Sequence, residues 1–242
     1  MTMQYLAYRS PYGKSGKRLA YALGLTPLRD FNRRLPSDGS VRISWAAHCQ
    51  GALNGEINWS KLNQLQQWKE ADLSTLEHSL QPKPTWLGRS GSSHGGGDFL
   101  GSLTRPTYWT KPVTDVTREW RVHVCRKPGT RAGTPSSYQV IRLGYKVNEN
   151  PSLNKVVAGV QIRSRQFGWK IQYLNLRELM NRKDLSLLIR WALSTIGWDF
   201  GAVDVLETGD GRYHLLEANS APGLLDDKTL EAYRAALEGF IG

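Results

Sequence analysis

The sequence has 242 residues, of which 40% are hydrophobic and nine are tryptophan, so it can bury a substantial core in one or two domains. No stretch approaches the roughly 18 apolar residues of a membrane span, and no apolar signal segment is evident, so we expect a cytoplasmic protein. Two cysteines and five histidines without ligand spacing exclude a disulfide framework and a structural zinc site. The net charge of +11, concentrated in residues 1–34 and 105–131, favours an anionic partner; the alternative is a solvated basic surface.

Strand and helix signals alternate along the chain, which is typical of an α/β or α+β protein. Strands are predicted at residues 5–8 and 41–46, with a helix at 15–23 between them that ends at Gly24. A second helix is predicted to begin at Ser60, because apolar residues follow it at helical spacing. Two later helices are predicted from their apolar stripes, at residues 184–197 and 227–240.

A glycine-rich loop occupies residues 88–98. Glycines such as Gly95 and Gly96 allow backbone N–H groups to approach phosphate oxygens closely, and Arg89 adds a fixed positive charge. We therefore interpret the loop as a phosphate-binding segment. The alternative is a flexible surface loop, which is the commoner fate of Gly/Ser runs.

Residues 119–125 alternate between apolar and polar side chains, with Trp120, Val122 and Val124 on one face and Glu119, Arg121 and His123 on the other. This period of two predicts a half-buried strand with a polar face. On that face, Glu119 can orient the guanidinium of Arg121 toward an anion. The alternative is a local ion pair on a solvent-exposed face, which contributes little energy.

Near the C-terminus, β-prone residues flank Asp210-Gly211, which is a strong signal for a hairpin with a type I′ turn. A turn centred there places Asp204 directly opposite Glu217, with Asn219 on the same face. Facing carboxylates repel each other, so we expect a cation between them, and three oxygen ligands suit Mg²⁺. The alternative is an exposed hairpin with scattered acids, because the register is inferred.

Taken in order, these segments resemble the motifs of the ATP-grasp superfamily, in particular its short carboxylate–amine ligase-like members, including phage-encoded ones and relatives of the ribosomal-protein glutamate ligases. GWDFGAVDVLETGDGRYHLLEANSAPGL (197–224) resembles the metal-binding hairpin, EWRVHV (119–124) the acid-x-Arg strand, and WLGRSGSSHGGGDF (86–99) the phosphate loop. Ser60-Lys61-Leu62 and residues 160–169 resemble two further motifs. Ser60 and Ser164 stand where the family has Asn, and Arg89 stands where Lys is common.

The resemblance implies an α/β protein in which two α+β lobes grip ATP, with the ATP-grasp fold. It divides the chain into a small, abbreviated N-terminal α/β domain at residues 1–58 and a catalytic region at 59–242. Within that region it implies a glycine-rich lid lobe at about 80–125 and a metal-binding lobe at about 126–242.

The resemblance also implies roles for individual residues. One or two Mg²⁺ ions, for which Mn²⁺ could substitute, would be held by Asp204, Glu217 and Asn219. ATP would be contacted by Lys61, Arg89, Gly95, Gly96, Lys111 and Glu119, with residues 109–113 passing the adenine. The transferring phosphoryl group or the substrate carboxylate would be held by Arg121, Arg163 and Lys146.

The implied reaction activates a carboxylate as an acylphosphate and joins it to an amine, with release of ADP. The acceptor could be anionic or macromolecular, such as a peptide, a protein tail or a nucleotide, and no membrane partner is expected. A phage-encoded member would work in the host cytoplasm. Neither the substrates nor the oligomeric state follows from the sequence. Two alternatives stay open: an ATP-grasp kinase that stops at a phosphorylated substrate, and a basic nucleic-acid-binding protein.

Overall fold

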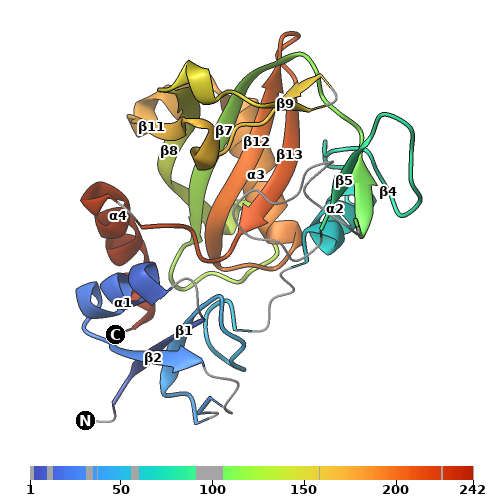
Figure 1. Ribbon diagram of the computed structural model, residues 1–242. Coiled ribbons are helices and arrows are strands. Elements are labelled where there is room, and N and C mark those ends of the chain that lie inside the picture. Colours follow the sequence, from blue (N-terminus) through green and yellow to red (C-terminus); the bar gives the residue numbers. More distant parts are fainter. Residues whose placement is uncertain are drawn as a thin grey trace.

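The computed structural model describes residues 3–9, 13–30, 35–36, 38–55, 60–90, 106–157, 159–224 and 226–241. Within these ranges the chain forms a parallel sheet near the N-terminus, a five-stranded antiparallel sheet and a small antiparallel sheet, with helices packed around them (Figure 1). No helix among the described residues is both long enough and apolar enough to cross a membrane.

The N-terminal unit is a parallel sheet with the strand order β2-β1-β3, made of β1 (Tyr5–Arg9), β2 (Thr26–Asp30) and β3 (Val41–Trp45). Helix α1 (Gly13–Ala22) follows β1 and packs against it. A Cβ atom at Gly16 of this helix would lie only 2.7 Å from the Cβ of Tyr8, so glycine permits the close packing. Strand β2 is not predicted by the sequence, because it contains a proline and lacks an alternating pattern.

The five-stranded sheet forms the centre of the molecule, with the strand order β11-β8-β7-β12-β13. Its strands are β7 (Val116–Arg126), β8 (Tyr138–Asn148), β11 (Trp169–Leu174), β12 (Phe200–Thr208) and β13 (Tyr213–Asn219). Helix α3 (Lys183–Thr195) covers one face and shares a core with Trp120 and Val122 of β7. The other face of β7 is also buried, since Glu119 is 4% exposed and His123 is 1% exposed. The prediction of a half-buried strand is therefore wrong, because β7 is a central strand covered on both sides.

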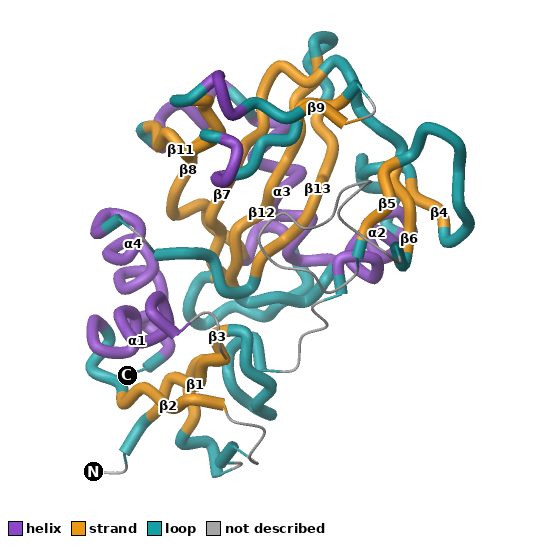
Figure 2. Tube along the Cα trace, viewed as in Figure 1, coloured by secondary structure: helices purple, strands orange, loops and turns teal. Residues whose placement is uncertain are grey.

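The smaller sheet has the order β4-β6-β5 and consists of β4 (His78–Ser79), β5 (Leu87–Arg89) and β6 (Tyr108–Thr110). Helix α2 (Lys61–Glu70) lies near this sheet and contacts β13 (Figure 2). Ser60 caps α2 as predicted, since its hydroxyl accepts the Asn63 N–H at 3.4 Å. The described fold is completed by a ribbon of β9 (Val156–Val157) and β10 (Val160–Gln161) and by short 3-10 segments at Pro135–Ser137, Pro151–Leu153, Arg165–Phe167, Leu176–Asn181 and Glu238–Phe240.

A second core joins the N-terminal unit to the central sheet. Trp45 of β3 stacks on Phe200 of β12 with ring centroids 5.5 Å apart, and Tyr233 packs edge-on against Trp45 at 5.6 Å. Tyr233 belongs to the last helix, α4 (Asp227–Leu237), which lies beside α1 (Figure 1). The C-terminal helix is thus part of the same body as the N-terminal sheet.

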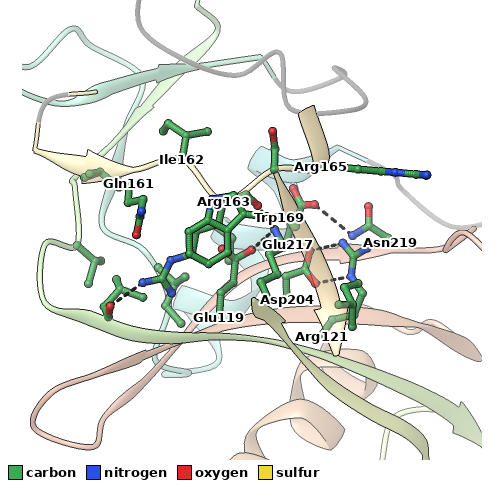
Figure 3. A pocket seen from close by; sticks show the side chains of 18 of the residues that line it. Glu119, Arg121, Gln161, Ile162, Arg163, Arg165, Trp169, Asp204, Glu217 and Asn219 are labelled. Atoms are coloured by element: carbon green, nitrogen blue, oxygen red, sulfur yellow. Dashed lines mark hydrogen bonds and ion pairs between the residues drawn. The ribbon is translucent and has the colours of Figure 1, made fainter. Parts of the chain in front are cut away.

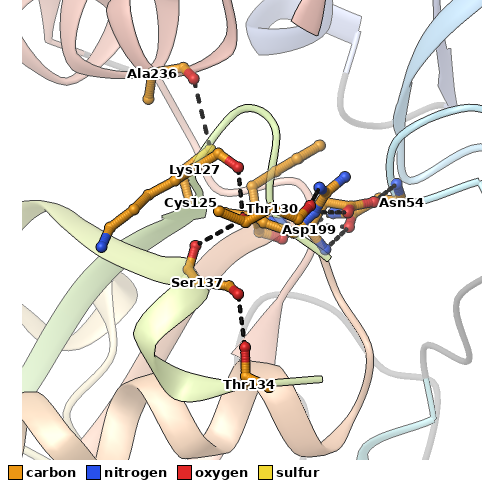
Figure 4. Close-up of polar contacts among 10 residues, drawn as sticks. Asn54, Cys125, Lys127, Thr130, Thr134, Ser137, Asp199 and Ala236 are labelled. Carbon is orange, nitrogen blue, oxygen red and sulfur yellow. Dashed lines mark hydrogen bonds and ion pairs between the residues drawn. The ribbon is translucent and has the colours of Figure 1, made fainter. Parts of the chain in front are cut away.

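A polar clamp reinforces this junction (Figure 4). The Asn54 side chain accepts the Asp199 N–H at 2.7 Å and donates to the Phe200 carbonyl at 2.8 Å. The Asn54 N–H donates to the Asp199 carboxylate at 2.9 Å, and Arg126 donates to the same carboxylate at 2.7 Å. Asn54 adopts a left-handed backbone with a φ of 55°, which asparagine tolerates better than most residues.

The lid lobe that we expect at residues 80–125 does not coincide with one sheet. Strands β5 and β6 belong to the small sheet, whereas β7 pairs with β8 and β12 in the central sheet. We therefore propose a boundary between the lobes near residue 115, where the chain passes from β6 into β7.

Candidate active site

Asp204 of β12 lies directly opposite Glu217 of β13, as the sequence predicts. The pairing depends on a bulge, because Val205 pairs with Leu215 and leaves Leu216 as an extra residue on β13. A bulge shifts the register by one residue and re-aims the side chains beyond it. Here it brings Glu217 opposite Asp204.

The turn of this hairpin is not the predicted type I′ turn. The Thr208 N–H donates to the Arg212 carbonyl at 2.9 Å, and the Gly211 N–H donates to the Thr208 carbonyl at 2.9 Å. Within the turn, which is wholly described, only Gly211 has a positive φ, of 80°. This is a three-residue loop with glycine in the left-handed position. The loop has one residue more than the predicted two-residue turn, and this shifts the pairing next to the loop by one residue. The bulge at Leu216 shifts the pairing back, so Asp204 still lies opposite Glu217 although the predicted turn is wrong.

Each carboxylate of the hairpin already faces a cation. Arg121 of β7 donates from Nε to Asp204 Oδ1 at 2.7 Å and from Nη2 to Oδ2 at 2.5 Å. Lys61, the first residue of α2, places Nζ 2.8 Å from Glu217 Oε2. The Asn219 amide donates to Glu217 Oε1 at 3.1 Å. The positive charge expected between the two acids is thus supplied within the chain by Arg121 and Lys61.

These contacts fix the charge states of the cluster. Burial disfavours the ionised form of Glu217, but Lys61, Arg121 and Asn219 outweigh it and lower the pKa of Glu217 to about 2. Burial likewise opposes the charge on Arg121, yet Asp204 and the other nearby carboxylates raise the pKa of Arg121 above its usual value. Glu217 and Arg121 are therefore both charged at neutral pH.

Glu119 does not orient Arg121, contrary to our expectation. Glu119 forms an ion pair with Lys146 on the neighbouring strand β8, and Lys146 also donates to the Arg163 carbonyl at 2.6 Å. Burial raises the pKa of Glu119, and Lys146 opposes this rise. The reason for the correction is geometric: residues on adjacent strands approach each other more closely than residues two apart on one strand.

His123 continues the same face of β7 toward α4. Its Nδ1 lies 3.1 Å from the Tyr233 hydroxyl, and its Nε2 lies 3.3 Å from the Tyr173 hydroxyl. Burial, reinforced by Arg121, lowers the pKa of His123 to about 3, so the imidazole is neutral. His123 therefore links two tyrosines and does not add charge to the cluster.

A cavity of about 820 Å³ gathers the sequence-predicted residues into one site (Figure 3). Every one of them that the structure describes lines it: Lys61, Arg89, Lys111, Glu119, Arg121, Lys146, Arg163, Asp204, Glu217 and Asn219. The two others, Gly95 and Gly96, lie outside the described residues, as does most of the glycine-rich loop. Residues from positions 61 to 219 thus converge on a single cavity.

One end of the cavity is apolar and borders the small sheet. Leu76, Leu87 and Val113 line it, close in sequence to Arg89 and Lys111. Arg89 donates to the Thr110 hydroxyl at 2.9 Å, and Lys111 forms an exposed ion pair with Glu77 at 3.0 Å. This end can accept a flat apolar group, and its cations can face the anionic part of the same ligand.

The opposite end contains residues to which the sequence reasoning assigned no role. They come from the segment before β11, from β11 and from the loop after β13, and include Ser164, Arg165, Trp169, Tyr173 and Asp226. A weak signal for them exists, because Ser164 and Trp169 fall within the segment that resembles a family motif. Tyr173 and Asp226 have no sequence signal beyond polarity.

No protein-family model matches the sequence, and no curated protein matches it either. The structure, in contrast, is similar to solved ATP-grasp enzymes. The ATP-grasp ligase PsnB, solved with a minimal precursor, aligns over 100% of both chains with a TM-score of 0.60 and 12% identity. Carboxyaminoimidazole ribonucleotide synthase from Aspergillus clavatus, complexed with ATP, has a TM-score of 0.62 and 13% identity, covering 98% of this chain and 76% of that one.

A third similar structure is the macrocyclase MdnC from Microcystis aeruginosa, bound to the precursor peptide MdnA. It has a TM-score of 0.53 and 12% identity, and covers 96% of this chain and 98% of its own. The architecture of the chain is therefore the ATP-grasp fold, as the resemblance of its motifs implies. At these identities the likeness defines the fold, and the chemistry has to be argued from the site.

Proposed function

We propose that this protein is an ATP- and Mg²⁺-dependent ligase that joins a carboxylate to an amine through an acylphosphate, with release of ADP. The observation that carries the proposal is the gathering of two opposed carboxylates, an amide and eight cationic side chains in one cavity of an ATP-grasp fold. Phosphoryl transfer requires mainly positioning and charge neutralisation, which such a cavity supplies.

The donor set fits Mg²⁺. The side-chain oxygens of Asp204, Glu217 and Asn219 are hard ligands on one face of the sheet. Both acids already form ion pairs at this place, Asp204 with Arg121 and Glu217 with Lys61. No cluster of three or more His, Cys, Asp or Glu is found in the described part of the chain, so the third donor is the amide. When bound, the metal would neutralise phosphate charge. PsnB has been solved with Mg and ADP, which supports this assignment by likeness of fold.

The nucleotide would lie with its base at the apolar end of the cavity, near Leu76, Leu87 and Val113. Arg89, Lys61 and Lys111 would contact its phosphates, and Gly95 and Gly96 remain predicted phosphate contacts. Because Lys61 and Arg121 now neutralise the hairpin acids, arriving phosphates would compete with those acids for the same cations.

In the reaction, an oxygen of the substrate carboxylate attacks the γ-phosphorus, and the bond to the ADP oxygen breaks. An amine nitrogen then attacks the acyl carbon, phosphate leaves with the carbon–oxygen bonding electrons, and the nitrogen loses a proton. Arg121 and Arg163 would stabilise charge on the transferring group, and Lys146 would hold the Arg163 backbone in place.

For the substrates we propose a peptide-type partner. PsnB and MdnC are both described in complexes with precursor peptides, and the net charge of +11 favours an acceptor with negative charge. The test is ADP release with Mg-ATP against a panel of amino acids, short acidic and basic peptides and nucleotides, followed by the mass of the product. A condensed product supports a ligase. A phosphorylated product would identify a kinase, and no ADP release with any of them would contradict the proposal.

A further inference from the structure

Four acids line the cavity in the part of the chain that the structure describes, and Asp226 differs from the other three. Glu119, Asp204 and Glu217 each form an ion pair with a lysine or arginine that also lines the cavity. Their side chains are 6%, 2% and 22% exposed, whereas that of Asp226 is 39% exposed. Asp226 is therefore the acid of the cavity that a reactant can reach most easily.

The carboxylate of Asp226 can accept further hydrogen bonds. It accepts the Thr229 N–H on Oδ1 at 2.8 Å and the Thr229 hydroxyl on Oδ2 at 2.6 Å. A carboxylate has about four acceptor positions, so about two stay open. Among the described residues the cation paired with Asp226 is Arg142, whose Nη2 lies 3.6 Å from Oδ1, beyond hydrogen-bond length.

Arg142 is held in place by contacts other than Asp226. Its guanidinium carbon lies 4.4 Å from the centroid of the Tyr173 ring, and its Nε donates to the Thr229 hydroxyl at 3.4 Å. Burial opposes the charge on Asp226, but the bonds from Thr229 and the charge of Arg142 lower the pKa of Asp226 below its ordinary value. Asp226 is therefore ionised at neutral pH and can still accept hydrogen bonds.

Asp226 lies beside one end of a row of residues that crosses the central sheet. The row runs from Tyr173 of β11 through Gly144 of β8 and Arg121 of β7 to Asp204 of β12, each paired with the next. Because paired residues point to the same face, Tyr173 and Arg121 share the cavity face with only a glycine between them. Arg142 contacts both Tyr173 and Asp226, which places Asp226 at the Tyr173 end. A reactant at Asp226 would therefore reach Arg121 from the side away from the metal hairpin.

Resting on the proposed function, we infer that Asp226 binds the amine reactant in its protonated form. Aliphatic amines ionise with pKa values of about 8 to 10, so they are cationic at neutral pH and need a negative group. Their N–H donors match the open acceptor positions of Asp226, whereas the other acids of the cavity already face cations. The acceptor would thus be an aliphatic primary amine, such as the α-amino group of a peptide or a lysine side chain. The exocyclic amines of nucleotide bases are uncharged and would gain nothing there.

Asp226 also caps helix α4, so the test has to separate its charge from its capping bond. Asp226→Asn does this, because asparagine caps a helix about as well as aspartate but carries no charge. The Thr229 amide donates to Asp226 and therefore reports on the site in ¹⁵N NMR spectra. With Mg-ADP present, methylammonium chloride should shift the Thr229 signal, and tetramethylammonium chloride, which has no N–H donor, should shift it much less at equal concentration. In Asp226→Asn the methylammonium response should fall about tenfold or more.

Asp227, the next residue, offers a matched control. Its side chain is 94% exposed, pairs with Arg18 and does not line the cavity. Asp227→Asn removes the same charge one position further along the helix and should leave the methylammonium response unchanged. An equal loss in both variants would overturn the inference, because it would reflect the general field at the helix terminus and not a site at Asp226.

Once the substrate panel gives a condensed product, kinetics provide a second readout. Asp226→Asn should raise the KM of the amine about tenfold or more and leave the KM of ATP unchanged. Hydroxylamine, which is mostly uncharged at neutral pH, attacks the acyl carbon of the acylphosphate through its nitrogen, releases phosphate and leaves a hydroxamate. Because it needs no counter-charge, hydroxamate formation should be equal in the wild-type protein and in Asp226→Asn. A purely structural defect would lower both reactions together and would contradict the inference.

The inference also fails if methylammonium leaves the Thr229 signal unmoved or moves it equally in Asp226→Asn. Calorimetry of Mg-ADP on the same samples separates this result from the proposed function. Nucleotide binding without a methylammonium response defeats only the amine site, whereas a methylammonium response without nucleotide binding or ADP release defeats the ATP-dependent function.

Discussion

Arg121 of β7 donates two parallel hydrogen bonds, of 2.7 and 2.5 Å, to the carboxylate of Asp204 on the adjacent strand β12. The Asp204 side chain is 2% exposed and that of Arg121 is 23% exposed, so both charges are largely removed from water. Such a pair contributes little net stability, yet removing one partner is costly because the other charge stays buried. Asp204, the proposed metal ligand, and Arg121, the candidate catalytic arginine, are therefore structurally interdependent.

We predict that Asp204→Asn lowers the free energy of unfolding by about 3 kcal/mol, because Arg121 loses its counter-charge. Two acids facing each other without a cation would give the opposite result, a more stable variant. ATP turnover should be lost as well, since the amide is a poor metal ligand. Urea unfolding and ADP release measure the two effects. Glu231→Gln on the exposed side of α4 is the control and should change neither; a stable, active Asp204→Asn would contradict the assignment.

The low pKa of Glu217 predicts that the free energy of unfolding decreases as the pH is lowered. Its pKa is about 2 in the folded protein against an ordinary value of 4.5, so the unfolded chain binds more protons between these pH values. Stability from this group is complete above about pH 4.5 and is lost as the pH falls toward 2. In Lys61→Met the Glu217 pKa should rise toward 4.5, so the loss of stability on acidification should be smaller and should end at a higher pH. Urea unfolding across pH 2–6 tests this, and identical profiles for both proteins would contradict it.

His123 predicts a separate effect at milder pH. Its pKa falls from 6.5 to about 3 on folding, so between these pH values the imidazole is protonated in the unfolded chain and neutral in the folded protein. Stability from the neutral imidazole is present above pH 6.5 and declines as the pH falls below it, with a slope of about 1.4 kcal/mol per pH unit. His123→Gln should remove that slope, most visibly between pH 6 and 4.5, where the carboxylates contribute least, and should leave the carboxylate contribution below pH 4.5. Equal slopes in both proteins would show that His123 is protonated in the fold.

The hydrogen bonds of Asn54 with Asp199 and Phe200 should stabilise the packing of the N-terminal unit against the central sheet. Asn54→Ala loses the side-chain hydrogen bonds and places alanine at a φ of 55°, so we expect a loss of about 2–4 kcal/mol. Asn54→Gly loses the same bonds but relieves the backbone, and should be less damaging by about 1 kcal/mol. Thermal unfolding ranks the two variants. If glycine proves as harmful as alanine, the left-handed backbone contributes nothing to the cost.

The local features of this protein follow from its sequence. Ser60 is the cap of α2, and Gly24 and Gly197 end α1 and α3 with φ values of 67° and 68°, as their positions predict. These features depend on a few neighbouring residues, whose backbone preferences act over one turn of chain. The ordered motifs of the ATP-grasp resemblance also lie in the sequence itself, and the fold agrees with them.

The pairing of charges was decided only by the tertiary structure. Glu119 and Arg121 are two residues apart on β7, but each finds its partner on another strand, Lys146 and Asp204 respectively, because cross-strand neighbours are closer. Likewise, Glu217 is neutralised by Lys61 from a helix 156 residues earlier in the chain. The pairing of Asp204 with Glu217 depends on both levels. The hairpin signal in the sequence predicted it, but in the structure it results from a longer loop together with a compensating bulge. Which cation neutralises which acid depends on distances between segments remote in sequence, and such distances exist only once the sheets have packed.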